Sequence, residues 1–297
     1  MTTIVADGSL IFALEPHPLA ASLAQQLGIE QGKTSQRLFP DGESYLCIDT
    51  PVKNRHCIVL ADLSLLFLVQ TLREFGAASV GLVAPYLSYM RQDRRFIEGE
   101  AITSRIFAQD LSAHIDWLVT VDPHLHRYHS LDEIYSIPSR VVAGAPLLAD
   151  WLKGQTNLLL IGPDAESEQW VSQIAAHSGH PFVIGAKQRF GDRDVQVSLP
   201  DLSAYQQHTV VIIDDVIASG QTILKCISAL RVQGIERIKC AGVHGIFADG
   251  ADAQLLGAGL DELATTNTIV HPSNAMDISP LLLGPIRECM QNLTVGN

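Results

Sequence analysis

The segment TVVIIDDVIASGQTIL, residues 209–224, decides the fold more than any other part of the sequence. A run of β-branched and apolar residues leads into two adjacent carboxylates, Asp214 and Asp215. A turn of small residues then precedes a stretch with apolar side chains at helical spacing. This order predicts a buried strand, a loop at its carboxyl end and a helix. In an open parallel sheet, that edge is where ligands bind.

The same alternation of strand and helix runs along the rest of the chain. Strands are expected at 9–14, 57–60, 80–84, 117–121, 158–161, 182–184, 210–213 and 239–244. Helices are expected at 18–27, 65–75, 102–113, 166–178, 221–233 and 251–258. The alternation predicts an α/β protein with mainly parallel sheets and helices on both faces. The small, Pro/Gly-bounded stretch PSRVVAGAP, residues 138–146, predicts a division into two domains, 1–140 and 141–297.

Composition excludes several classes of protein. The 297 residues carry 20 Lys and Arg against 32 Asp and Glu, a net charge of −12, which argues against nucleic acid as the main partner. The richest apolar run, 65–69, is far shorter than a membrane span. The first basic residue is Lys33, so no secretory signal is expected and a cytoplasmic location is predicted. Five cysteines without a CxxC pair indicate reduced thiols.

The chemistry of 209–224 suggests two kinds of ligand group. Free backbone N–H groups at a helix start favour phosphate, and the turn that supplies them is Ala218, Ser219, Gly220, Gln221 and Thr222. Two carboxylates cannot also bind phosphate, and they suit sugar hydroxyls or a divalent cation. An ordinary capped turn would explain Asp215 and Ser219, but not an acid pair at the end of an apolar strand.

This segment resembles the phosphoribosyl-pyrophosphate binding motif of type I phosphoribosyltransferases and of ribose-phosphate pyrophosphokinases. Further segments resemble the second family: RLFPDGESYL (37–46), APYLSYMRQDRRF (84–96), VDPHLH (121–126), GPDAES (162–167) and TNT (266–268). A phosphoribosyltransferase would lack the first three. The chain's compact segments FIEGEAITSR and DRDVQV look more like the archaeal-type subgroup of the pyrophosphokinase family. The resemblance implies two type I phosphoribosyltransferase-like domains, the first on the ATP side and the second on the ribose 5-phosphate side.

The resemblance implies an ATP site in the first domain. Its residues would be Phe39, Asp41, Glu43, Arg91, Gln92, Asp93, Arg94 and His124. Guanidinium groups bind phosphate bidentately, and Gln or Arg can hydrogen-bond a purine edge. In the family the loop that matches 39–43 reaches into a neighbouring subunit, which implies a homo-oligomer. Arg95 is equally compatible with a solvated salt bridge to Glu98 and Glu100.

The histidine segment leaves two metals to consider. His124, His126 and His129 suggest zinc, but no Cys or Glu completes a zinc site at the usual spacing. Magnesium bound with phosphates prefers oxygen ligands and water. The resemblance implies Mg²⁺ with His124 and Asp164 as its contacts and Asp122 as support. His126 and His129 stay unassigned.

For the second domain the resemblance implies a ribose 5-phosphate site and a basic catalytic hairpin. The sugar phosphate would contact Asp164, Asp214, Asp215 and residues 218–222, and Lys187 and Arg189 would act in catalysis. The implied activity is transfer of a diphosphoryl group from MgATP to ribose 5-phosphate. A non-catalytic regulatory paralogue and a phosphoribosyltransferase are the alternatives. The chain departs from the common family pattern in a short loop after Leu60 and in the compact segments FIEGEAITSR and DRDVQV.

Overall fold

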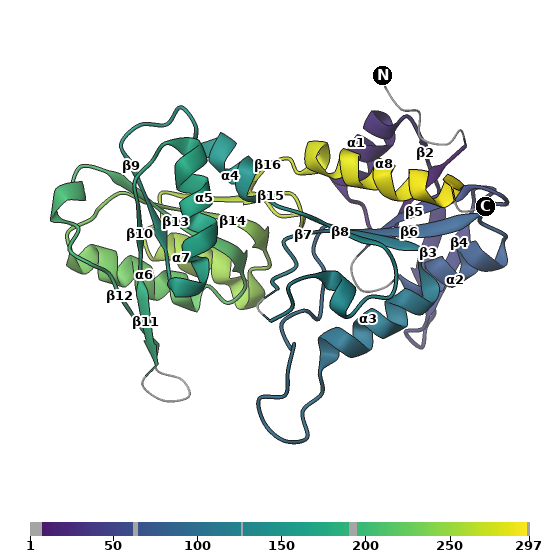
Figure 1. The fold of residues 1–297 in the computed structure, drawn as a ribbon, viewed down its shortest axis with the longest axis horizontal. Helices are drawn as coiled ribbons and strands as arrows, with labels where there is room; N and C mark the ends of the chain where they lie inside the picture. Colours follow the sequence, from purple (N-terminus) through teal and green to yellow (C-terminus); the bar gives the residue numbers. More distant parts are fainter. Residues whose placement is uncertain (1–7, 62–64, 126, 190–194, 296–297) are drawn as a thin grey trace. The chain divides into compact units, whose positions relative to one another are not determined.

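The computed structural model describes residues 8–61, 65–125, 127–189 and 195–295 (Figure 1). The chain forms two compact units, one made of Met1–Val142 with Ser279–Asn297 and the other of Ala143–Ile278. Each unit contains one six-stranded sheet. None of the helices in the described residues is long and apolar enough to cross a membrane.

The sheet of the first unit has the strand order β2-β1-β5-β6-β7-β8, and all of its pairs are parallel. Its strands are β1 (Leu10–Ala13), β2 (Glu30–Gln31), β5 (His56–Leu60), β6 (Ser79–Ala84), β7 (Trp117–Val121) and β8 (Ser139–Val142). Its helices are α1 (Pro18–Leu27), α2 (Leu66–Glu74), α3 (Thr103–His114) and α8 (Ser279–Val295), with a 3₁₀ turn η1 (Leu131–Glu133). Helices α1 and α8 lie side by side (Figure 1).

The sheet of the second unit has the order β10-β9-β13-β14-β15-β16 and is also parallel throughout. Its strands are β9 (Leu158–Gly162), β10 (Phe182–Ile184), β13 (Thr209–Ile217), β14 (Ile238–Gly245), β15 (Glu262–Thr266) and β16 (Asn274–Met276). Its helices are α4 (Ala145–Leu152), α5 (Glu168–Ser178), α6 (Gln221–Val232) and α7 (Ala251–Gly257), with 3₁₀ turns η2 (Ala165–Ser167), η3 (Ser203–Tyr205) and η4 (Ala248–Gly250).

The two sheets follow the same path. In each unit the first strand is followed by an outer strand, and the third strand pairs with the free side of the first. An antiparallel hairpin follows the outer strand in both: β3 (Thr34–Leu38) with β4 (Ser44–Ile48), and β11 (Ala186–Arg189) with β12 (Val195–Ser198). The strand order therefore reverses between β1 and β5 and between β9 and β13. The predicted class, parallel α/β sheets in two phosphoribosyltransferase-like units, is confirmed.

Burial on both faces explains why the central strands form from nearly continuous apolar runs. In β13, Val210 and Ile212 pack with Ile223 and Ile227 of α6 in one hydrophobic cluster. The intervening Val211 and Ile213 are also fully buried, and they point to the opposite face of the sheet. In the first unit, Leu68 and Leu72 of α2 belong to one hydrophobic cluster with residues of β1, β5 and β6.

The boundary between the two units, Val142/Ala143, falls within the stretch 138–146, where β8 pairs with β7 and α4 begins at Ala145. The structure differs from the sequence predictions at two places. Residues 279–295, predicted to belong with the second domain, form α8 of the first unit, where Ser279 Oγ accepts a hydrogen bond of 3.0 Å from Ser22 Oγ. The acid pair lies within β13 because this strand pairs with β14 as far as Ile217.

A close approach between two strands of the first unit gives a test of the packing. Gly81 pairs with Trp117, and a β-carbon at Gly81 would lie 1.9 Å from Cε2 of the indole. Since Trp117 is buried and cannot move aside freely, Gly81→Ala should lower the free energy of unfolding by about 2–3 kcal/mol in urea titrations.

Gly284→Ala in α8 of the same unit provides the control. A β-carbon there would meet nothing within 4 Å among the described residues, so stability should be unchanged or slightly higher. Equal stability of the two variants would contradict the close packing of Trp117 on Gly81.

Candidate active site

Three carboxylates flank the point where the strand order reverses in the second sheet. Strands β9 and β13 pair only as far as Ile161 and Ile212. Asp164 follows the end of β9, and Asp214 and Asp215 lie on the part of β13 that continues beside β14 alone. Because ligands of open α/β sheets bind at such reversal points, these acids occupy the expected position for a site.

The charge of this cluster is unfavourable in the free protein. Burial, followed by the charges of Asp215 and Asp164, holds the pKa of Asp214 well above its ordinary value. The N–H of Asp215 donates to Oδ1 of Asp214 at 3.1 Å and offsets part of this effect. Oδ1 of Asp164 accepts from the N–H of Glu166, also at 3.1 Å. A cation or a set of hydroxyl donors would relieve the repulsion.

The loop that follows β13 presents the amino end of α6. Gly220 stands at the N-cap with φ 68°, a left-handed conformation that glycine adopts without steric cost. Because Gly220 has no side chain, the N-cap position itself supplies no side-chain acceptor to the first turn of α6. Ser219 and Gln221 are exposed, and Ala218 and Thr222 are half-buried. The N–H groups of the first turn are therefore available to an anion.

The loop after β14 is hydrogen-bonded to the start of the loop between β13 and α6. The carbonyl of Ile217 accepts hydrogen bonds from Ile246 and Phe247 at 3.0 and 3.1 Å, and that of Ala218 accepts from Ala248 at 3.0 Å. The backbone of residues 217–218 is thus tied to residues 246–248.

The segment TNT, 266–268, forms buried hydrogen bonds to β14. The hydroxyls of Thr266 and Thr268 donate to the carbonyl of Val243 at 2.8 and 3.1 Å, and Nδ1 of His244 lies 2.9 Å from Oγ1 of Thr268. Sequence reasoning did not assign His244, which is fully buried. Its position inside an apolar strand was the only available signal.

The basic hairpin expected around Lys187 and Arg189 is β11–β12. Lys187 pairs with Val197 and Arg189 pairs with Val195. The side chains of Lys187 and Arg189 and the backbone of 190–194 lie outside the described part of the chain.

Strained backbone marks the histidine segment of the first unit. Asp122 and His124 both have positive φ, 32° and 55°, and the N–H of His124 donates to the carbonyl of Asp122 at 2.8 Å. Such conformations cluster at functional sites. Among the residues that the structure describes, no group of three His, Cys, Asp or Glu could hold a metal ion. His126 lies outside the described residues.

The RQDR segment is fastened to residues that sequence reasoning missed. The side chain of Asp93 is only 6% exposed and lies 3.4 Å from Nη1 of Arg127. The hydroxyl of Tyr128 donates to the carbonyl of Asp93 at 3.2 Å. Asp93 therefore joins the RQDR segment to the segment that follows His124. Sequence separation hid this pair, because nothing in the local pattern links 93 to 127.

The arginines of this segment differ in their surroundings. Arg91 and Arg94 are exposed, and the guanidinium of Arg94 lies 4.7 Å from the ring centroid of Phe96. Arg95 donates from Nε to the carbonyl of Glu100 at 2.9 Å, while the carboxylate of Glu100 accepts from the N–H groups of Phe96 and Ile97. Arg95 thus meets the backbone of Glu100 instead of its carboxylate. The carbonyl of Gln92 accepts from Ser104 at 3.3 Å.

The β3–β4 hairpin carries an aromatic tip. The guanidinium of Arg37 lies 4.6 Å from the ring centroid of Phe39 and 4.4 Å from that of Tyr45. Oδ1 of Asp41 accepts from the N–H of Glu43 at 3.1 Å and fixes the turn. Phe39 remains 38% exposed, which leaves one aromatic surface open to a flat ring.

The chain is similar to known proteins over most of its length. Residues 9–114 match the N-terminal domain of ribose phosphate pyrophosphokinase, and residues 130–255 match the phosphoribosyl transferase domain. The ribose-phosphate pyrophosphokinase of Methanopyrus kandleri is 30% identical over 287 residues, covering 93% of this chain and 96% of the relative. The chain belongs to the ribose-phosphate pyrophosphokinase family.

Other members of the pyrophosphokinase family agree with this assignment. The ribose-phosphate pyrophosphokinase of Methanobrevibacter smithii is 28% identical, covering 91% of this chain and 97% of the relative. The phosphoribosylpyrophosphate synthetase of Mycobacterium smegmatis has the same fold, with a TM-score of 0.82 at 24% identity and coverage of 96% of this chain and all of that one. The family resemblance seen in the sequence is confirmed. The roles of individual site residues stay predictions.

The raised pKa of Asp214 predicts how a pyrophosphokinase-family site affects stability. The protonated carboxyl of Asp214 contributes to the free energy of unfolding. This contribution is fully present below the ordinary pKa of an aspartate and is lost as the pH rises through the raised pKa of Asp214. Asp214→Asn should therefore raise the free energy of unfolding by about 1 kcal/mol at pH 8 without magnesium or substrates. The gain should shrink at pH 5, as measured by urea titration.

Asp150→Asn, at an exposed position of α4 in the same unit, serves as the control and should change stability little at either pH. A loss of stability in Asp214→Asn at pH 8 would contradict the unfavourable charge of the cluster.

Proposed function

We propose that the chain transfers the diphosphoryl group of MgATP to the anomeric hydroxyl of ribose 5-phosphate. The products are phosphoribosyl diphosphate and AMP. The observation that carries this proposal is the pairing of a carboxylate cluster with an uncapped helix start at one reversal point. A ligand with hydroxyls at one end and phosphate at the other satisfies both, and membership of the pyrophosphokinase family supports the same reaction.

Ribose 5-phosphate would bind at the second sheet. Asp214 and Asp215 would accept hydrogen bonds from the ribose hydroxyls, with Asp164 beside them. The 5-phosphate would lie at the amino end of α6, within the loop formed by Ala218, Ser219, Gly220, Gln221 and Thr222. The loop is held in place by its hydrogen bonds to residues 246–248 before the substrate arrives.

Mg²⁺ fits the chemistry of the donor groups. It binds one or two carboxylates together with substrate phosphates and water, so it needs no closed protein cage. Burial and then the charges of Asp215 and Asp164 raise the pKa of Asp214, and a cation beside these carboxylates would offset that cost. When bound with ATP, the ion would neutralise phosphate charge and orient the β-phosphorus. His124 offers a nitrogen and suits a phosphate contact at least as well as a metal contact.

ATP would bind through the first unit. Arg91 and Arg94 are exposed and able to hold phosphates or the purine edge, with Gln92 between them. Asp93 would act by positioning, since its carboxylate is buried against Arg127. Phe39 would stack on adenine, with Asp41 and Glu43 near the base and ribose.

The reaction needs no protein nucleophile. The oxygen of the anomeric hydroxyl attacks the β-phosphorus and its proton passes to solvent, while the bond from the β-phosphorus to the α,β-bridging oxygen breaks and AMP leaves. Lys187 and Arg189 would stabilise the negative charge that spreads over the transferring group. Because Phe39 would act in a neighbouring subunit, the proposal includes a homo-oligomer, checked by the mass in solution. A cytoplasmic location stays a prediction.

The deciding experiment incubates the pure protein with MgATP and ribose 5-phosphate and measures AMP. We expect AMP and phosphoribosyl diphosphate in equal amounts, and AMP only when the sugar phosphate is present. AMP formation at the same rate without the sugar would refute the proposal. A regulatory paralogue would form no AMP, and a phosphoribosyltransferase would consume phosphoribosyl diphosphate when a base is added.

Lys187→Ala tests the basic hairpin. Removing one cation from the transition state should lower kcat by about two to three orders of magnitude, while the Kd of ribose 5-phosphate stays within about twofold. Steady-state kinetics and calorimetry measure the two quantities. Gln188→Ala, between the two basic residues, is the matched control and should keep most of the activity. Unchanged turnover in Lys187→Ala would remove this residue from the catalytic set.

A further inference from the structure

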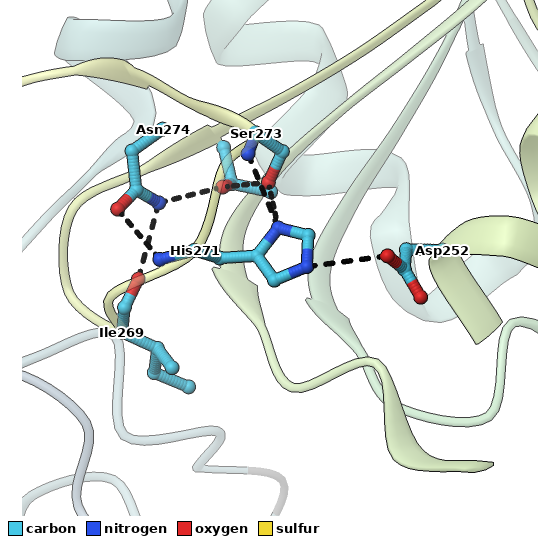
Figure 2. Close-up of polar contacts among 6 residues, drawn as sticks. Asp252, Ile269, His271, Ser273 and Asn274 are labelled. Atoms are coloured by element: carbon cyan, nitrogen blue, oxygen red, sulfur yellow. Dashed lines mark hydrogen bonds and ion pairs between the residues drawn. The ribbon is translucent and has the colours of Figure 1, made fainter. Parts of the chain in front are cut away.

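A polar cluster lies behind the loop that holds the sugar phosphate in the proposed function. His271 stands at its centre: Nε2 lies 3.4 Å from Oδ2 of Asp252 at the start of α7, and Nδ1 lies 2.8 Å from Oγ of Ser273 (Figure 2). The hydroxyl of Ser273 is 2.7 Å from that of Thr265, which also accepts from Asn274 at 3.0 Å. The cluster ties α7 to the ends of β15 and β16.

The hydrogen bonds define what each side of the imidazole does. Nδ1 accepts from the backbone N–H of Ser273 at 3.1 Å, so the proton of a neutral ring lies on Nε2 and faces Asp252. The backbone N–H of His271 donates to Oδ1 of Asn274 at 3.0 Å. Asn274 in turn donates to the carbonyls of Thr266 and Ile269, which closes the turn. The ring is therefore fixed in position and in orientation.

A first route leads from this ring to the sugar-phosphate loop. The ring of Phe247 lies 4.4 Å from the ring of His271, centroid to centroid, and is only 7% exposed. Phe247 has φ 50° and folds back over Gly245, where a β-carbon would lie 2.4 Å from its ring. The backbone of 246–248 donates three hydrogen bonds to the carbonyls of Ile217 and Ala218. His271 therefore packs against Phe247, which lies in the segment that is hydrogen-bonded to the start of the sugar-phosphate loop.

A second route runs through α7. Asp252 lies in its first turn, and Leu255 one turn later packs against Gly220, where a β-carbon would lie 3.3 Å from the leucine side chain. Gly220 is the N-cap of α6. The contact between His271 and Asp252 therefore fixes α7 relative to the point where the proposed phosphate site begins.

We infer that His271 is a positioning residue for ribose 5-phosphate, acting with Asp252 through Phe247 and Leu255 on the 217–222 loop. The inference rests on the proposed function. Neither residue would touch the substrate. The pair would keep the N–H groups of α6 and the carbonyls of 217–218 in the arrangement that the sugar phosphate requires.

His271→Ala tests this inference. We expect the KM and Kd of ribose 5-phosphate to rise about tenfold, as is usual for residues that support a binding shell. The KM of ATP at saturating ribose 5-phosphate should stay within about twofold, and kcat should fall less than the affinity for the sugar phosphate. A purely structural role would lower the amount of folded protein without this difference between the two substrates.

Two substitutions at Asp252 serve as a second test that keeps the histidine. Asp252→Ala should raise the KM of ribose 5-phosphate in the same direction as His271→Ala. Asp252→Asn keeps an oxygen near Nε2 of His271 at almost the same side-chain size and should stay near the wild-type value. His177→Ala is the control, because His177 is exposed and its Nδ1 hydrogen-bonds the carbonyl of Gln173 in its own helix, α5.

The results separate the two levels of the argument. If the wild type neither binds ribose 5-phosphate in calorimetry nor forms AMP, the proposed function fails and this inference fails with it. If the wild type does both, and His271→Ala and Asp252→Ala keep its Kd for the sugar phosphate within twofold, the proposed function stands and the positioning role is refuted. Equal rises in the KM of both substrates would also refute it.

Discussion

The mutual repulsion of three carboxylates at one end of a parallel sheet is the constraint on which the site depends. Strand β13 pairs with β9 only as far as Ile212 but continues beside β14. Asp214 and Asp215 therefore lie beyond the end of the pairing with β9. Burial there raises the pKa of Asp214. The start of α6 has the opposite need, since its first N–H groups have no acceptor within the helix and the N-cap, Gly220, has no side chain. The free protein thus holds adjacent regions of unfavourable negative and positive charge, and one ligand can neutralise both.

The two units use the same strand order for different purposes. Both insert a hairpin after the outer strand, but the first hairpin carries Phe39 and Tyr45 and the second carries Lys187 and Arg189. Three residues, 218–220, separate β13 from α6 and include the left-handed Gly220, whereas five residues, 61–65, separate β5 from α2. One topology therefore supplies an aromatic surface in one unit and a phosphate-type loop in the other.

Sequence patterns predicted the elements that are buried on both faces, because such strands and helices must be apolar throughout or at a strict period. The buried strand 117–121 was predicted with its observed bounds, and so were the half-buried helix 18–27 and the edge strand 182–184. The short edge strands β8 and β16 gave no such signal. Helix α8 was missed because Gly284 and Pro285 interrupt its pattern, although the helix continues through them.

The local part of the candidate site was visible in the sequence, whereas its supports were not. The acid pair and the turn after it form one continuous segment, so their chemistry could be read directly. Asp93 with Arg127, and His271 with Asp252, join residues that are separated by 34 and 19 positions along the chain, since 127 − 93 = 34 and 271 − 252 = 19. Pairings of this kind depend on how loops meet at a sheet edge, which periodicity does not encode.

The return of α8 to the first unit affects how the protein can be made. The second unit is one uninterrupted stretch, Ala143–Ile278, while the first waits for residues that are synthesised after it. Helix α8 packs on β7, β8 and α1, so that face of the first sheet stays uncovered until translation has passed residue 279. Domains generally fold in the order in which they leave the ribosome. Here the later-emerging unit has all of its residues first, and the earlier one closes last.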